Sequence, residues 1–238
     1  MHTVLSPCAG IEMIPPLIVE EALGNGIQLI AITDHNASAN VAAVMQAARE
    51  TELIILPGME LQTREEVHVL CLFDELDQLA VLQAWVDRAL PPIPNNPDFF
   101  GEQFIVDATG EFIAREERLL LNSVDGSLQQ AWQQVNALGG LFIPAHVNRT
   151  AFGLIGVLGL VPDDLSLEAL EISRHMQPEE TLRKFPQLRG YPLIQNGDVH
   201  YLGDYLGATN YHIEAPTVAE LRLALRMEAG RSFDHPTH

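Results

Sequence analysis

An acidic side chain and a histidine stand where two short apolar stretches of the sequence would have to bury them. Residues 53–60 begin with a continuously apolar run that stops at Pro57-Gly58, which is typical of a strand buried on both faces, and Glu60 follows its end. His68 lies inside the β-branched and aromatic run 66–73. Either group is costly to bury without a partner, and a metal ion would pair with both. Alone, each residue is better explained more simply, as a solvated glutamate or a hydrogen-bonded core histidine.

Further polar residues follow the carboxyl ends of other expected strands, at 29–33, 141–145, 169–172 and 193–196. They are, in chain order, Asp34 and His35, His146, Arg174 and His175, and Asp198 and His200. In a parallel α/β barrel such strand ends share one opening, where active sites lie. This placement favours a functional site over scattered surface histidines, although His35 alone is equally well explained as a turn residue.

Imidazoles and carboxylates together suit Zn, Mn or Fe. The candidate ligands are His2, His35, Glu60, His68, His146, Asp198 and His200. A carboxylate has two oxygens and can bridge two ions, which lower the pKa of a shared water and hold the oxygens of a phosphate ester. The residues therefore predict hydrolysis of a phosphoester by a metal-activated hydroxide.

The elements that would position these residues alternate between strand and helix, which predicts a parallel sheet built from βαβ units. The expected helices are 15–23, 40–50, 76–90, 127–138 and 217–226, and a last strand covers 208–213. Pro91–Pro97 interrupts this alternation, and the hairpin-like stretch after it predicts an insertion at 91–125. Residues 1–226 are expected to form one domain, followed by a flexible tail at 227–238.

The composition limits the expected partners and location. The net charge is −19, from 13 basic and 32 acidic residues, which predicts no binding to duplex nucleic acid or to an anionic membrane. A small phosphorylated substrate is compatible with this charge if metal ions invert the local potential. Two cysteines, no signal peptide and apolar runs too short to span a bilayer predict a cytoplasmic protein.

Five short motifs in the same order resemble the polymerase-and-histidinol-phosphatase (PHP) domain. They are TDHN at 33–36, PGME at 57–60, EVHV at 66–69, PAHVNR at 144–149 and GDVH at 197–200. The resemblance runs from His2 to about Tyr211 and is nearest to the small stand-alone phosphoesterases of that family. It implies an irregular seven-stranded β/α barrel, similar to a TIM barrel, that holds up to three metal ions.

The resemblance also implies which residues share an ion. One position would contain Glu60, His68 and His146; a second Glu60, His2 and Asp198; a third His35 and His200. Asp34 would support His35 from behind. Glu60, as the bridge, and Asp198, as a proton shuttle, would be the catalytic carboxylates of a metal-dependent phosphoesterase acting on a small phosphomonoester such as a nucleotide or a sugar phosphate.

Three more residues are candidates for holding the substrate phosphate. Arg149, Arg174 and His175 follow strand ends, and an arginine can bind a phosphate through two hydrogen bonds. Salt bridges with the abundant acidic residues explain these side chains at least as well.

The sequence departs from the family pattern at its start. The family opens with a His-x-His pair on its first strand, whereas this chain begins Met1-His2, which predicts a truncated first strand. Cys8 lies near a position where the family often has an aspartate or a histidine. The second and third positions are each short of a ligand, which predicts between one and three ions per chain. Alternatively, the natural start lies upstream.

Two other functions fit the same residues. The truncated first motif would also fit a barrel that binds metal or phosphate without turnover, as a regulatory or accessory module. A metal-dependent hydrolase of another bond, such as an amide, uses the same chemistry. Activity against phosphate and amide substrates with added Mn²⁺ distinguishes these functions.

Overall fold

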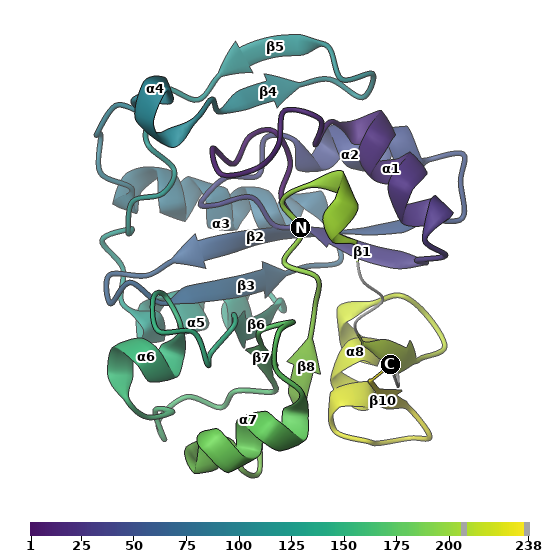
Figure 1. The fold of residues 1–238 in the computed structure, drawn as a ribbon, viewed down its shortest axis with the longest axis vertical. Helices are drawn as coiled ribbons and strands as arrows, with labels where there is room; N and C mark the ends of the chain where they lie inside the picture. The colour runs from purple at the N-terminus through teal and green to yellow at the C-terminus, as the bar shows by residue number, and fades with distance from the viewer. Residues whose placement is uncertain (206–208, 236–238) are drawn as a thin grey trace.

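A four-stranded mixed sheet lies at the centre of the fold. The computed structural model describes residues 1–205 and 209–235, and the strand order of this sheet is β1-β2-β3-β6. The strands are Leu29–Ile32, Ile54–Gln62, His68–Leu72 and Leu141–Pro144. β1 and β2 are parallel, whereas β3 is antiparallel to both β2 and β6 (Figure 1). β3 therefore begins at the edge of the sheet where the other three strands end.

The second strand is longer than the sequence predicts. β2 does not stop at Pro57-Gly58 but continues to Gln62, because residues 58–62 pair with β3. Glycine at position 58 permits this continuation, since a Cβ there would lie 3.0 Å from Ile32 O, Leu72 Cδ2 and Thr33 Cγ2. Glu60 consequently lies within a paired strand rather than in the loop after it.

Two further strands form a separate sheet. β7 (Leu170–Ile172) and β8 (Leu193–Gln195) are parallel and three residues long each. The backbone N–H of Val147, just after β6, donates to the carbonyl of Glu171 at 2.8 Å. The irregular α/β architecture is as predicted. The predicted closed seven-stranded barrel is not confirmed, because the paired strands of residues 1–205 and 209–235 form separate sheets.

The first residues of the chain lie between β1 and the segment after β8. Met1 pairs with the edge of β1: its amino group donates to Ala31 O at 2.9 Å, and Thr33 N–H donates to Met1 O at 2.8 Å. On the other side, His2 N–H donates to Val199 O at 3.0 Å. A cavity of about 830 Å³ lies beside Met1 and is lined in part by Leu29, Leu56 and Ile143.

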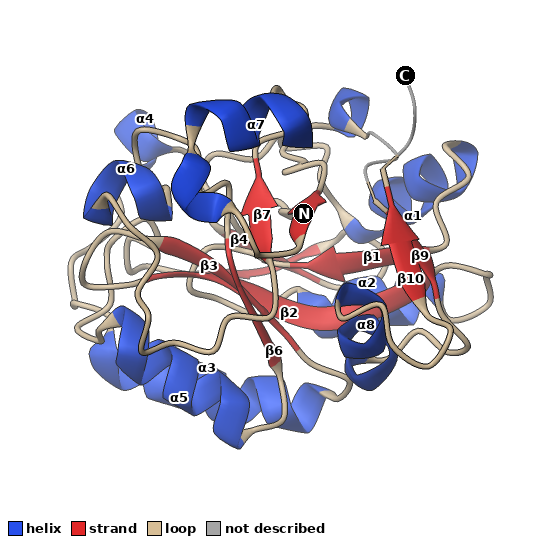
Figure 2. Cartoon of the chain, turned by 90° about the horizontal axis from the view of Figure 1, so that it is seen from below, coloured by secondary structure: helices blue, strands red, loops and turns tan. Residues whose placement is uncertain are grey.

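Helices cover the sheet on the side away from this cavity (Figure 2). They include α3 (Leu76–Ala89), which buries Leu79, Leu82 and Val86, and α5 (Leu128–Ala137). The other helices of at least five residues are α1 (Pro15–Gly24), α2 (Val41–Ala48), α6 (Leu154–Leu158), α7 (Pro178–Lys184) and α8 (Val218–Leu225). Ser127 begins α5 as predicted, since its hydroxyl accepts the N–H of Gln130. None of the helices in the described ranges is long and apolar enough to cross a membrane.

The segment predicted as an insertion forms its own two-stranded sheet. α4 (Pro97–Phe100) precedes β4 (Phe104–Val106) and β5 (Phe112–Arg115), which are antiparallel and lie at the top of Figure 1. Asn40 fixes the hairpin, because its side chain donates to Phe104 O at 3.0 Å and accepts Val106 N–H at 3.0 Å. The hairpin is thereby attached beside the loop that carries His35.

The end of the chain differs from the prediction. Residues 227–238 are not simply a flexible tail, because β10 (Ser232–Asp234) pairs antiparallel with β9 (Asn210–His212). Arg231 binds Glu220 of α8 at 2.8 Å and so fixes the approach to β10. Residues 206–208, which include the start of the predicted last strand, and residues 236–238 lie outside the described residues.

We expect Gly58→Ala to lower the free energy of unfolding by about 1–3 kcal/mol, because the added methyl group must displace β1 or β3. Gly24→Ala is the control. A Cβ at this last residue of α1 meets nothing within 4 Å, so the change should stabilise the protein by up to about 1 kcal/mol. Urea denaturation of both variants measures these changes, and equal stabilities would contradict the close approach at Gly58.

Candidate metal centre

Four imidazoles surround the carboxylate of Glu60. Glu60 is 2% exposed, and its Oε1 lies 2.9 Å from His68 Nδ1 and 3.2 Å from His146 Nε2. Its Oε2 lies 2.9 Å from His2 Nε2 and 3.9 Å from His35 Nδ1. Each oxygen of one buried carboxylate therefore faces two histidines.

The strand directions bring these side chains together. His68 is the first residue of β3 and lies opposite Gln62 near the end of β2, because the two strands are antiparallel. His146 follows the end of β6, and His35 forms a bridge with Glu60 just after β1. His68 thus reaches the site from the start of its strand, while the others reach it from strand ends.

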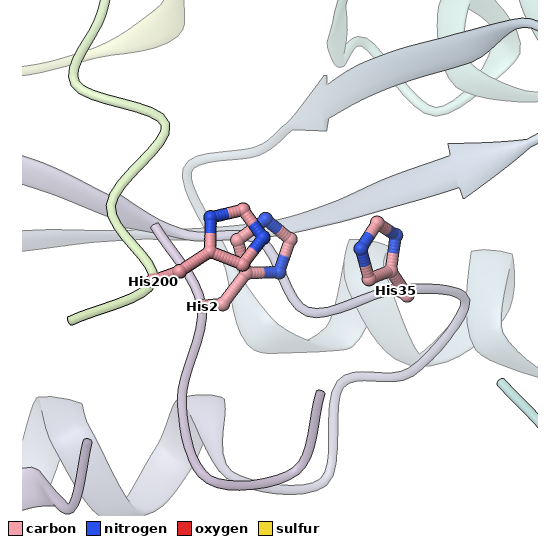
Figure 3. Close-up of side chains that lie close together, drawn as sticks. All are labelled: His2, His35 and His200. Carbon is pink, nitrogen blue, oxygen red and sulfur yellow. The ribbon is translucent and has the colours of Figure 1, made fainter. Parts of the chain in front are cut away.

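Three groups of side chains have ligand atoms within 4.8 Å of one another. They are His2, Glu60 and Asp198; His2, His35 and His200; and His35, Glu60 and His68. The first is the predicted second position. In the second group His2 joins the predicted pair, and its ring stacks on that of His200 at 4.1 Å between centroids (Figure 3). In the third group His35 lies beside Glu60 and His68, while His146 is outside the group although it lies 3.2 Å from Glu60 Oε1.

Three of the histidines have one ring nitrogen beside an oxygen of a neighbouring residue. His2 Nδ1 lies 3.0 Å from Ser6 Oγ, His68 Nε2 lies 3.1 Å from Gln62 Oε1, and His200 Nδ1 lies 2.9 Å from Asp198 O. When this nitrogen donates its proton to the oxygen, the other nitrogen of the neutral ring keeps a free lone pair. This arrangement is typical of histidines that bind a metal ion.

Asp34 was predicted to support His35, but its carboxylate binds Thr3 and Ser6, and Ser6 Oγ in turn lies beside His2. Asp34 Oδ1 accepts the Ser6 hydroxyl at 2.7 Å and the N–H of Thr3 at 2.7 Å. Because Ser6 gives its proton to Asp34, its oxygen is left to accept one from Nδ1 of His2. His2 Nε2 is then the nitrogen that would give up its proton to a cation, and it is the atom that faces Glu60 and Asp198.

The charges within the cluster shift the pKa values strongly. Burial alone would raise the pKa of Glu60, but His68 and His35 hold it well below its usual range. Burial would lower the pKa of His2, but hydrogen bonds with Asp198 and Glu60 raise it to about 9. Burial and the neighbouring charge of His2 hold the pKa of His35 well below its ordinary value. Glu60 is therefore ionised at neutral pH.

The donor set fits a divalent cation. Nδ1 of His35, which lies 3.9 Å from Glu60 Oε2, is buried and has no hydrogen-bond partner among the described residues, although buried polar atoms are normally paired. The mixture of imidazole nitrogens and carboxylate oxygens is the one that Zn, Mn and Fe prefer. A cation would bind these donors and offset the anionic charge of Glu60 and Asp198.

The predicted phosphate-binding residues lie at the opening of the site. Arg149 Nη1 donates to Asp198 Oδ2 at 3.1 Å and is half exposed. Arg174 Nη1 donates to the carbonyls of Gly197 and Asp204, both at 2.9 Å, and so links the two ends of the loop that carries Asp198 and His200. These arginines and His175 line a cavity of about 570 Å³ whose floor includes Glu60.

Sequence reasoning missed three residues that hold the ligands in place: Ser6, Gln62 and Glu171. Gln62 follows Glu60 by two positions, and this period-2 spacing on one strand was a signal for a residue on the same face. Glu171 is an acidic residue inside an apolar strand, the same kind of signal that singled out His68. Ser6 carried no such signal, because a serine in a loop is ordinary.

Solved structures share this architecture at low sequence identity. No protein-family model matches the chain, and neither does any curated protein. The endonuclease Q of Pyrococcus furiosus, a lesion-specific endonuclease, superposes with a TM-score of 0.68 at 16% identity, over 98% of this chain and 56% of that one. A two-domain protein from Bacteroides vulgatus, which contains a predicted PHP-like metal-dependent phosphoesterase, superposes with a TM-score of 0.51 at 14% identity, over 94% of this chain and 60% of that one.

The chain has the PHP-like fold. It spans little more than half the length of the endonuclease Q structures that it matches.

One expectation about partners is wrong. A structure of endonuclease Q with a 27-mer duplex, whose abasic lesion lies at the active site, superposes with a TM-score of 0.67 at 16% identity, over 97% of this chain and 56% of that one. The same fold therefore accommodates duplex DNA, and the net charge of −19 does not exclude such a partner. Net charge is a property of the whole surface, whereas binding depends on the local potential, which bound cations invert.

We expect the metal-free protein to lose stability as the pH rises from about 6.5 to about 9. The pKa of His2 is raised from its ordinary 6.5 to about 9 on folding, so its charged form stabilises the fold fully below pH 6.5. This contribution is lost as the pH passes through about 9, with a slope of at most about 1.4 kcal/mol per pH unit. Urea denaturation with a chelator present measures it.

His2→Gln should flatten this slope, because glutamine does not titrate. His212→Gln is the matched control, since His212 is an exposed histidine paired with Asp234 at the other end of the fold. A slope in His2→Gln equal to that of the wild type would contradict the assignment of the titrating group.

Proposed function

We propose that the protein is a metal-dependent hydrolase of phosphoesters. The observation that carries this proposal is the division of the Glu60 carboxylate between two pairs of imidazoles, with His68 and His146 on Oε1 and His2 and His35 on Oε2. A carboxylate with each oxygen in such a setting is suited to bridge two cations, and paired cations are the common device for attacking a phosphate ester.

The residues that would hold the ions are those of the cluster around Glu60. We assign Glu60, His68 and His146 to one position, Glu60, His2 and Asp198 to a second, and His35 and His200 to a third, with Mn, Fe or Zn as the metal. Bound divalent cations would activate a water for attack on phosphorus and neutralise charge on the phosphoryl oxygens.

The protein's own residues would do the remaining work. Glu60 stays ionised, because the surrounding imidazoles hold its pKa well below its usual range, and it would supply the negative charge that balances two cations. Asp198 lies at the edge of the cluster, with its side chain 26% exposed, so it can pass a proton to solvent. Arg149 is adjacent to Asp198 and half exposed, which suits it to bind a phosphate that enters the site.

For the substrate we propose a small phosphomonoester, such as a nucleotide or a sugar phosphate. The cavity above Glu60, of about 570 Å³, is within the range of small-molecule sites. Arg149 and Arg174 contribute guanidinium groups to its lining, His175 an imidazole, and Phe152, which stacks on His68 at 4.6 Å, an aromatic surface. A phosphate joined to a compact organic group matches both features.

A second candidate is hydrolysis of a phosphodiester in nucleic acid. The superposition of nearly the whole chain on endonuclease Q favours it. The chemistry at the metal ions would be the same, and the substrate would differ in what lies beyond the scissile phosphate.

Glu60→Gln should remove both metal and activity. The amide keeps the shape of the side chain but cannot bridge two cations, so we expect loss of at least one metal equivalent and a fall in kcat/KM of more than about 100-fold. Elemental analysis and phosphate release from p-nitrophenyl phosphate with Mn²⁺ measure these effects. Glu50→Gln, at an exposed residue just after α2, should change neither quantity. Wild-type protein that holds metal but releases no phosphate from any ester would support a regulatory module instead.

A comparison of substrates separates the two candidate functions. We expect kcat/KM to be higher for small phosphomonoesters than for a duplex oligonucleotide that contains an abasic site, because the cavity accommodates a single compact ester. Phosphate release and strand cleavage are measured with the same metal-loaded protein. A higher kcat/KM on the duplex would assign the nuclease function.

A further inference from the structure

Glu171 is a buried carboxylate beside the cluster. It lies in β7, is 4% exposed, and belongs to neither of the groups that surround Glu60. Its Oε2 accepts the backbone N–H of His146 at 2.9 Å, and its Oε1 accepts Nδ2 of Asn196 at 2.7 Å. Burying an acidic group next to Glu60 and Asp198 is unfavourable, and these two hydrogen bonds offset part of that cost.

The two partners of Glu171 belong to separate sheets. His146 follows β6 in the four-stranded sheet, whereas Asn196 follows β8 in the two-stranded sheet, and β6 and β7 do not pair within the described residues. Glu171 therefore spans the join between the sheets, and each of its oxygens holds a segment that carries a candidate ligand: His146 itself, and Asp198 two residues after Asn196.

Both segments have backbone conformations that require support. His146 has φ +32° and Asp198 has φ +47°, in the left-handed region that residues other than glycine adopt uncommonly, histidine and aspartate more often than most. Such backbone conformations persist where hydrogen bonds and packing from neighbouring residues hold them. The bond from His146 N–H to Glu171 fixes the first directly, and the bond from Asn196 fixes the start of the loop that contains the second.

We infer that Glu171 is a positioning residue that sets the separation between the two metal positions sharing Glu60. One position uses His146 and the other uses Asp198, so the distance between the strand ends determines whether both can be filled at once. This inference rests on the proposed pair of metal ions. It assigns Glu171 no contact with substrate or with the reacting atoms.

Glu171→Gln tests the inference with little change in volume. Both partners of Glu171 are N–H donors, so the amide nitrogen of glutamine must face one of them, and one bond is lost. We expect the first metal ion to bind nearly as in the wild type and the second to bind about 10–100-fold more weakly. Calorimetric titration of the metal-stripped protein with Mn²⁺ measures both constants.

A spectroscopic readout separates positioning from general stability. Two Mn²⁺ ions bridged by one carboxylate give an exchange-coupled electron paramagnetic resonance signal, which should be replaced in Glu171→Gln by the signal of a single ion. Glu168→Gln is the matched control. Glu168 lies three residues away and binds Arg222 and Arg226 at 2.8 and 2.7 Å, so its loss should lower stability and leave the coupled signal intact.

Two results would overturn the inference. One is a Glu171→Gln protein with the wild-type affinity for the second ion and the wild-type coupled signal. The other is a wild-type protein that binds a single ion, since no separation then exists to be set. Failure of the proposed function would look different: the coupled signal would be present in the wild type, and no phosphoester would be hydrolysed.

Discussion

The structure depends on one charge, the carboxylate of Glu60, buried among histidines. A lone carboxylate in that position would be strongly unfavourable, and the imidazoles on both of its oxygens compensate it. Three of the histidines have a further hydrogen-bond partner: Ser6 for His2, Gln62 for His68 and the carbonyl of Asp198 for His200. The imidazole rings therefore face the buried charge, and neutral oxygens bind the second nitrogen of several of these rings.

Strand direction decides which side chains can reach that charge. In a wholly parallel sheet His68 would lie at the edge opposite Glu60, because it begins its strand. The reversal of β3 moves it to the same edge, so a residue at the start of one strand meets residues at the ends of the others. The mixed sheet therefore concentrates more ligand atoms at a single edge than consecutive parallel strands of the same length would provide.

Much of the site was predictable from the sequence, because polar residues after apolar strands leave a clear pattern. His35, His146, Asp198 and His200 are of this kind, whereas the grouping of His2, Glu60 and Asp198, and of His68 and His146 with Glu60, was implied by the resemblance to the PHP domain. The direction of β3 was not predictable from its residues, since a short, mostly apolar strand fits a parallel or an antiparallel position in a sheet equally well. The role of Asp34 was also missed, because it depends on the path of the loop around Ser6. The strand at 232–234 was missed because three residues are too few to show an alternating pattern.

The position of Met1 has a practical consequence for handling the protein. Its amino group is enclosed and donates to Ala31 O and Thr33 Oγ1, and the cavity of about 830 Å³ begins beside it. An affinity tag fused ahead of Met1 would start at this enclosed position, one residue before His2. A fusion partner at the carboxyl end, beyond β10, avoids the candidate metal ligands, so purification and imaging reagents belong there.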